Sequence, residues 1–108
     1  MAVDPTPRSS ASALTLTPDQ RALVARIVRE TLVDAEAYAF GSRATGRARP
    51  YSDLDLLLVR QQPLSLVERA DLRDRFERSE LPFRVDIVEQ AGLSGPTAAR
   101  VAQERVRL

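Results

Sequence analysis

Residues 41–59 read GSRATGRARPYSDLDLLLV, and the second half of this stretch is the clearest strand in the chain. Leucines at 54, 56 and 58 alternate with Asp53 and Asp55, so one face of the predicted strand 52–59 is apolar and the other begins with two carboxylates. Aspartate is depleted in strands, and like charges on one face repel each other. A divalent cation between them would make the pair favourable, because Mg²⁺ prefers oxygen ligands.

A third carboxylate is predicted to join this pair. Asp86 lies in the next predicted strand, 81–88, in which Phe83, Val85 and Ile87 take the alternate positions. Neighbouring strands are about 4.8 Å apart, so Asp86 can reach the same cluster. Three carboxylates can hold two metal ions, one activating the attacking oxygen and one steadying the leaving phosphate. Such a site needs no His, Cys or Lys.

The start of the stretch predicts a phosphate-binding turn. Gly41 and Ser42 follow a predicted strand at 36–40 and open a polar loop with a short helix at 43–46. Glycine lets the backbone approach a phosphate closely, and exposed N–H groups and a hydroxyl bind anions. Arg43 could add a charged fork to the same phosphates. The alternatives are a helix cap for Ser42 and a solvated surface position for Arg43.

The remaining elements predict a small sheet with helices. Two capping boxes, Thr17 with Gln20 and Ser65 with Glu68, start helices over 17–33 and 65–78, and a terminal helix is expected over 97–107. Strands separated by helices favour an α+β (α/β) fold, a small mixed β-sheet with helices packed mainly on one face. Residues 1–16 are expected to form a flexible N-terminal arm. The predicted core is Leu23, Ile27, Leu54, Leu56, Phe76, Phe83 and Ile87.

The amino-acid composition excludes several classes of catalytic and metal-binding site. The chain has 108 residues, enough for one domain, and contains neither Cys nor His, while all 16 basic residues are Arg. Cys/His zinc sites, disulfides, nucleophiles paired with His, lysine-dependent P-loops and Schiff bases are therefore excluded. A net charge of +1 and 5% aromatic residues argue against a nucleic-acid partner. Without an apolar leader or spanning segment, a soluble cytoplasmic protein that binds no membrane is expected.

The spacing of these residues resembles a known signature. Gly41-Ser42, ten residues and then Asp53-Leu54-Asp55 are similar to the motif of the polymerase-beta-type nucleotidyltransferase superfamily. The compact GSRATG turn and the small size resemble the minimal nucleotidyltransferases, the MNT or MntA-like antitoxins. Asp86 stands where that family places its third carboxylate. The resemblance covers residues 17–108 and implies the nucleotidyltransferase fold there.

The resemblance also implies roles. Gly41 and Ser42 would hold the triphosphate of ATP, and the catalytic carboxylates Asp53, Asp55 and Asp86 would bind Mg²⁺, two ions in all. Asp86 would also help to activate the acceptor hydroxyl. Members of this family adenylylate a tyrosine of a HEPN-domain ribonuclease toxin encoded nearby, as the antitoxins of type VII toxin–antitoxin pairs. Thr45 departs from the pattern, since many relatives have Arg there, and the change is expected to weaken phosphate or partner contacts without altering the metal site.

Other interpretations stay open at this point. Asp53 could cap a strand, Asp55 could pair with a surface arginine, and Asp86 could be a surface acid beside Arg84. The chain could be a non-catalytic antitoxin, a binding module with a vestigial transferase site, or a nucleotidyltransferase acting on a small molecule of the aminoglycoside type. Arginines on the outer helical faces are interpreted as solubilising: Arg21, Arg26, Arg69 and Arg73.

Overall fold

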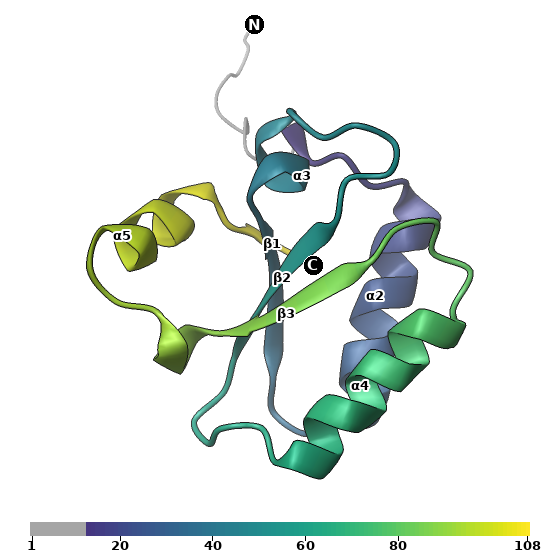
Figure 1. Ribbon diagram of the computed structural model, residues 1–108, viewed down its shortest axis with the longest axis vertical. Helices are drawn as coiled ribbons and strands as arrows, with labels where there is room; N and C mark the ends of the chain where they lie inside the picture. The colour runs from purple at the N-terminus through teal and green to yellow at the C-terminus, as the bar shows by residue number, and fades with distance from the viewer. Residues whose placement is uncertain (1–12) are drawn as a thin grey trace, which may run out of the picture.

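The computed structural model describes residues 13–108 as a mixed sheet with helices on both faces (Figure 1). The four strands lie in the order β3-β2-β1-β4. They are β1 Glu36–Phe40, β2 Leu54–Val59, β3 Val85–Glu89 and β4 Val106–Arg107. The helices are α2 Pro18–Thr31, α3 Ser42–Thr45, α4 Leu66–Arg78 and α5 Gly95–Glu104, with a 3₁₀ turn at Gln90–Gly92. The predicted mixed sheet is confirmed.

Strand directions decide which ends of the strands meet. β1 is antiparallel to both β2 and β4, whereas β2 and β3 are parallel, with α4 forming the crossover between them. In this register Phe40 lies opposite Asp55 on one side, and Asp86 lies opposite Asp55 on the other. The end of β1 therefore meets the starts of β2 and β3 at one end of the sheet.

Both predicted capping boxes are present. In α2 the Gln20 N–H donates to Thr17 Oγ1, and the Thr17 N–H donates to Gln20 Oε1, both at 3.0 Å. In α4 the Glu68 N–H donates to Ser65 Oγ at 3.0 Å, and the Ser65 N–H donates to Glu68 Oε1 at 2.9 Å. These bonds satisfy N–H groups that a helix start otherwise leaves without partners.

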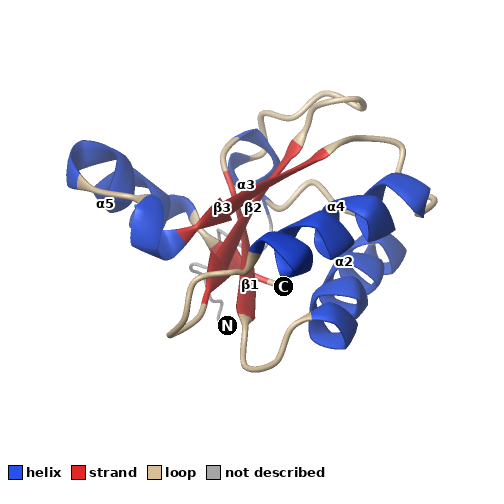
Figure 2. Cartoon of the chain, turned by 60° about the horizontal axis from the view of Figure 1, so that its bottom comes forward, coloured by secondary structure: helices blue, strands red, loops and turns tan. Residues whose placement is uncertain are grey.

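Two apolar layers hold the sheet. α2 and α4 cover one face, and α5 lies on the other (Figure 2). The larger layer includes Ile27, Leu54, Leu56, Phe76 and Phe83, as predicted from the sequence, while Leu23 and Ile87 pack against it half-buried. The smaller layer joins Phe40, Leu57 and Val101 on the α5 side, with Tyr38 half-buried beside them.

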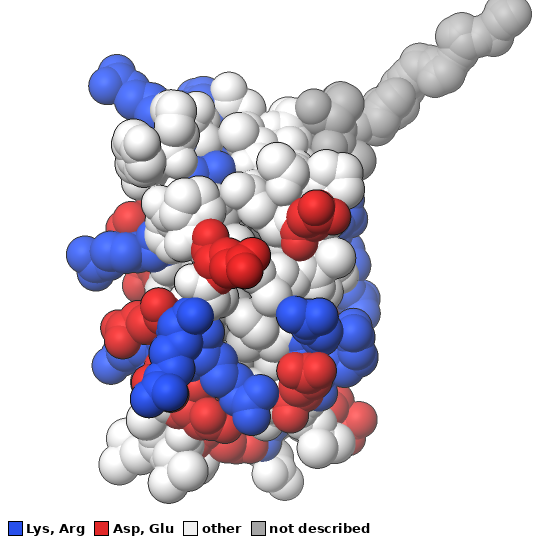
Figure 3. Space-filling view, turned by 90° about the vertical axis from the view of Figure 1, so that its right-hand side faces the viewer, with Lys and Arg blue, Asp and Glu red and all other residues white. Residues whose placement is uncertain are grey.

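The outer faces of α2 and α4 carry both signs of charge side by side rather than one continuous basic patch (Figure 3). Arg75 pairs with Asp71 at 3.3 Å, and Arg78 pairs with Asp74 at 3.1 Å, each four residues apart on α4. Such exposed pairs contribute little to stability and are typical of a solvated helical face. None of the helices in residues 13–108 has the length and apolar character that crossing a bilayer requires.

Several predicted boundaries were wrong. The central strand β2 begins at Leu54 rather than at residue 52, and the terminal helix α5 begins at Gly95 rather than at residue 97. β3 begins at Val85 rather than at residue 81, because residues 81–84 bend away from the sheet while Phe83 still reaches the core. α2 ends at Thr31, two residues before the predicted end. The terminal helix ends at Glu104 rather than 107, and Val106–Arg107 instead form β4 by pairing with Ala39 and Tyr38. A strand of two residues is too short to show a periodic pattern in the sequence, and it forms only by pairing with β1.

Part of the predicted N-terminal arm lies on the domain. Leu14 and Leu16 pack against the larger apolar layer, and the Thr15 N–H donates to the Arg43 carbonyl at 2.6 Å. Residues 1–12 of the predicted arm lie outside the described residues.

Arg43 is buried, with 3% of its surface exposed. Its guanidinium stacks 3.9 Å from the ring centroid of Phe83 and donates to four carbonyls at 2.8–3.4 Å, those of Thr15, Arg49, Pro50 and Ser52. The predicted phosphate-binding role is therefore not supported, because the guanidinium is directed into the protein. Its hydrogen bonds join the N-terminal segment to the 49–52 loop, and its stacking on Phe83 adds the segment that leads into β3.

We expect Arg43→Gln to lower the free energy of unfolding by about 2–3 kcal/mol, because four backbone carbonyls lose their charged donor and the stacking on Phe83 is lost. Arg43→Lys should rescue only part of this loss, since one ammonium group cannot reach all four carbonyls. Urea unfolding followed by circular dichroism measures the effect. Arg78→Gln, which removes an exposed pair, is the control and should change stability by less than about 0.5 kcal/mol. An equally small loss for Arg43→Gln would contradict the scaffold role.

Candidate active site

The predicted site residues meet at one end of the sheet. Gly41 and Ser42 follow β1, Asp53 and Asp55 stand at the start of β2, and Asp86 lies in β3 directly beside Asp55. Along β2 the leucines at 54, 56 and 58 face the larger apolar layer, so Asp53 and Asp55 face the opposite side, toward α5. The alternation seen in the sequence thus places the carboxylates on one face.

The absence of a side chain at Gly41 allows the Asp55 carboxylate to lie close to the backbone. A Cβ atom built on Gly41 would lie only 2.2 Å from Asp55 Oδ2, and the backbone φ of Gly41 is +73°. An L-residue with a side chain is strained at this φ and would also collide with the carboxylate. Glycine is therefore required twice over at this position, by backbone conformation and by contact.

The turn after Gly41 is internally braced. The N–H groups of Ala44 and Thr45 donate to the Gly41 carbonyl at 3.1 Å, and Thr45 Oγ1 donates to the same oxygen at 3.0 Å. The residue that departs from the family pattern, Thr45, thus stabilises the turn. No hydrogen bond within residues 13–108 involves the Ser42 hydroxyl.

The three carboxylates repel one another. Burial raises the pKa of Asp55 above its ordinary value, and the neighbouring charges of Asp86 and Asp53 raise it further, while Arg100 opposes the shift. Asp55 is half-buried, whereas Asp53 and Asp86 are exposed. An ionised Asp55 is therefore costly until a positive charge joins the cluster.

The donor set fits a hard divalent cation, since all three ligands would be carboxylate oxygens. Within residues 13–108 no group of three metal-binding side chains is already drawn together at ligand spacing. The carboxylates share a face and a register, so side-chain rotation is what would close them on a cation.

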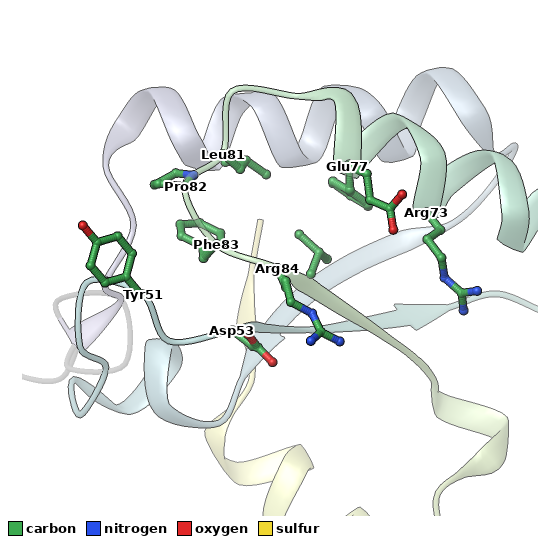
Figure 4. A pocket seen from close by; sticks show the side chains of 10 residues that line it. Tyr51, Asp53, Arg73, Glu77, Leu81, Pro82, Phe83 and Arg84 are labelled. Atoms are coloured by element: carbon green, nitrogen blue, oxygen red, sulfur yellow. The ribbon is translucent and has the colours of Figure 1, made fainter.

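Two clefts adjoin the carboxylates at the outer edge of β3 and share Asp53, Arg73 and Arg84. One, of about 510 Å³, extends to Tyr51 and Phe83, and Figure 4 shows Asp53 and Arg84 directed to the same side of it. The other, of about 320 Å³, also contains Asp86 and Arg69. Arg69 pairs with Glu89 at 2.9 Å. Two arginines interpreted from the sequence as solubilising, Arg69 and Arg73, thus line this edge of the site.

Two further residues reach the site from α5 and were missed in the sequence. The Gly41 N–H donates to Glu104 Oε1 at 3.2 Å, and Arg100 Nη1 lies 3.4 Å from the same oxygen. Their spacing of four marks them as neighbours on one helical face. Nothing in the sequence says that this face turns toward Gly41, because that depends on how α5 returns across the sheet.

Known proteins resemble this chain over the part that contains these site residues. A family model described as a nucleotidyltransferase domain matches residues 22–108. The probable protein adenylyltransferase MntA of Haemophilus influenzae is 37% identical over 86 residues, covering 80% of this chain and 75% of that protein. A chain described as a minimal nucleotidyltransferase superposes with a TM-score of 0.68 at 34% identity, over 83% of this chain and 90% of that one.

A more distant structure shares the fold. It is the complex of a tri-AMPylated HEPN toxin of Shewanella oneidensis with its MNT antitoxin, matched at a TM-score of 0.61 and 22% identity over 81% of this chain and 66% of that one. The family resemblance carried by the 41–59 stretch is confirmed by the family model and by relatives above 30% identity. This chain belongs to the nucleotidyltransferase domain family, as a minimal nucleotidyltransferase.

Proposed function

We propose that this chain transfers AMP from ATP to a hydroxyl of a partner protein, and that the partner is a HEPN-type toxin which the transfer neutralises. The observation that carries the proposal is the meeting of the Gly41-Ser42 turn with Asp53, Asp55 and Asp86 at one end of the sheet. The H. influenzae relative, described as a probable protein adenylyltransferase, supports AMP transfer. The AMPylated HEPN toxin bound to an MNT antitoxin supports the kind of partner.

The sheet order suggests where each substrate lies. The turn follows β1, the Asp53/Asp55 pair starts the central β2, and Asp86 is on the edge strand β3. In phosphoryl and nucleotidyl transfer the attacking and leaving oxygens lie roughly in line. With the β- and γ-phosphates against the turn, the acceptor hydroxyl enters from the β3 side. The clefts that contain Arg73 and Arg84 are on that side.

The reaction forms one bond and breaks another at the α-phosphorus. The acceptor oxygen, proposed to be that of a tyrosine, bonds to this phosphorus, and the bond to the bridging oxygen breaks to release pyrophosphate. Asp86 holds the acceptor hydroxyl and helps to remove its proton. Asp53 and Asp55 would hold Mg²⁺ with Asp86, and bound Mg²⁺ supplies positive charge that offsets charge on the phosphates. Ser42 and the turn would hold the triphosphate.

We expect Asp53→Asn and Asp86→Asn each to lower AMP transfer at least about 100-fold, because each removes a charged ligand or proton acceptor from the reacting centre. The measurement is transfer of label from α-phosphate-labelled ATP, with Mg²⁺, onto the protein encoded by the adjacent gene. Circular dichroism should show an unchanged fold in both variants.

Asp74→Asn is the matched control, since Asp74 is an exposed aspartate of α4 paired only with Arg78 among the described residues. It should leave transfer unchanged. Undiminished transfer in both site variants would overturn the proposal. If the wild-type chain transfers no label but binds and neutralises the partner, the chain is a non-catalytic antitoxin instead.

A second prediction concerns Asp55, whose pKa is raised by burial and by its acidic neighbours. At pH 7 its ionised form costs stability, so Asp55→Asn should raise the melting temperature of the metal-free protein by about 2–5 °C. This gain should shrink as the pH falls through the raised pKa and should vanish well below about 3.9, the ordinary value for Asp, where the wild-type carboxyl is protonated in both the folded and the unfolded state. Thermal unfolding followed from pH 3 to pH 8 measures this.

Mg²⁺ should stabilise the wild-type chain but not the Asp55→Asn variant. It should raise the melting temperature of the wild-type chain and leave that of Asp55→Asn unchanged, because a ligand stabilises only the state that binds it. Equal stabilisation of both would show that Asp55 is not part of a metal site.

A further inference from the structure

α5 brings a fourth carboxylate to the phosphate-binding turn. Glu104, its last residue, accepts the Gly41 N–H at 3.2 Å and has 15% of its side chain exposed. Its negative charge also contributes to the raised pKa of Asp55, so it lies within electrostatic reach of the other three. An anion thus already occupies a backbone donor of the turn proposed to hold phosphate.

α5 also brings a cation. Arg100 lies one helical turn before Glu104, with its Nη1 at 3.4 Å and 3.5 Å from the two carboxylate oxygens. Its side chain is 55% exposed, and its charge is the one that opposes the raised pKa of Asp55. Arg43, the arginine of the turn itself, is buried, and its guanidinium is committed to backbone carbonyls. Arg100 is therefore the arginine placed to meet a phosphate here.

We propose that Glu104 is a placeholder for the triphosphate and that Arg100 is a triphosphate ligand. When the nucleotide binds, a phosphate oxygen replaces the Glu104 carboxylate at the Gly41 N–H, and Arg100 exchanges its pair with Glu104 for a pair with the phosphate. This inference rests on the proposed function, because it concerns the same nucleotide.

The exchange is favoured by the chemistry of both anions. A carboxylate and a phosphate accept the same N–H and guanidinium donors, so no donor is left without a partner at either stage. Keeping Glu104 in place would hold a fourth carboxylate against a highly charged triphosphate, which is unfavourable. Glu104 ends α5, and the helix is anchored to the sheet mainly through the buried Val101. Rotation of one side chain is enough to release the turn.

The test is the affinity for AMP-PNP and for AMP, both with Mg²⁺, measured by isothermal titration calorimetry on the full chain. Glu104→Gln keeps an oxygen for the Gly41 N–H but removes the charge, so AMP-PNP should bind about threefold more tightly or better. Glu104→Ala should change the affinity in the same direction. Arg100→Gln should weaken AMP-PNP about tenfold and AMP less than twofold, because AMP lacks the β- and γ-phosphates. Arg78→Gln, distant on α4, should change neither.

Three results would overturn the inference. Weaker AMP-PNP binding by Glu104→Ala, rescued by Glu104→Gln, would show that Glu104 supports the turn rather than competing with phosphate. Unchanged affinities in all three α5 variants, with tight binding by the wild type, would refute the exchange and leave the proposed function standing. No binding of AMP-PNP by the wild-type chain would refute the proposed function and this inference together. If Glu104→Ala does not fold, an unchanged AMP-PNP affinity in Glu104→Gln still refutes the exchange.

Discussion

The contact between the Gly41 backbone and the Asp55 carboxylate sets the spacing on which the site depends. The missing Cβ allows Asp55 Oδ2 to lie where any other residue would place an atom. This contact joins the proposed phosphate-binding turn, at the end of β1, to the carboxylates at the start of β2. Because β3 is parallel to β2, Asp86 then falls beside Asp55 by register alone. The Gly41–Asp55 contact and the β2–β3 register therefore bring together groups from β1, β2 and β3.

Arg43 provides the support under this contact. The loop between the turn and Asp53 is polar and would otherwise be free to move, and its carbonyls at 49, 50 and 52 are held by the buried guanidinium. Stacking on Phe83 extends the support to the segment that leads into β3. A motif arginine that looks like a phosphate ligand in the sequence thus supports the scaffold instead, because its guanidinium is used by carbonyls and by Phe83.

Electrostatics connect the site with the C-terminal helix. The cluster formed by Asp53, Asp55 and Asp86 is unfavourable by itself, as the raised pKa of Asp55 indicates. Such a cluster favours binding of cations and opposes binding of a polyanion until cations are present. Arg100 brings a positive charge that opposes the raised pKa of Asp55, and Glu104 partly cancels that charge. The net charge close to the Gly41 turn therefore depends on residues that lie some sixty positions along the chain from Gly41.

The local features of this protein follow from short stretches of its sequence. Alternation around Asp53 and Asp55 placed two carboxylates on one face, and Thr17 and Ser65 marked helix starts, because these signals act over a few residues. Tertiary structure alone decided the pairing of Val106–Arg107 with β1, the burial of Arg43 and the approach of Glu104 to Gly41. Each of these joins segments distant in the chain. Packing and strand order determine which distant residues meet. Neither leaves a periodic pattern in the local sequence from which the contact could be predicted.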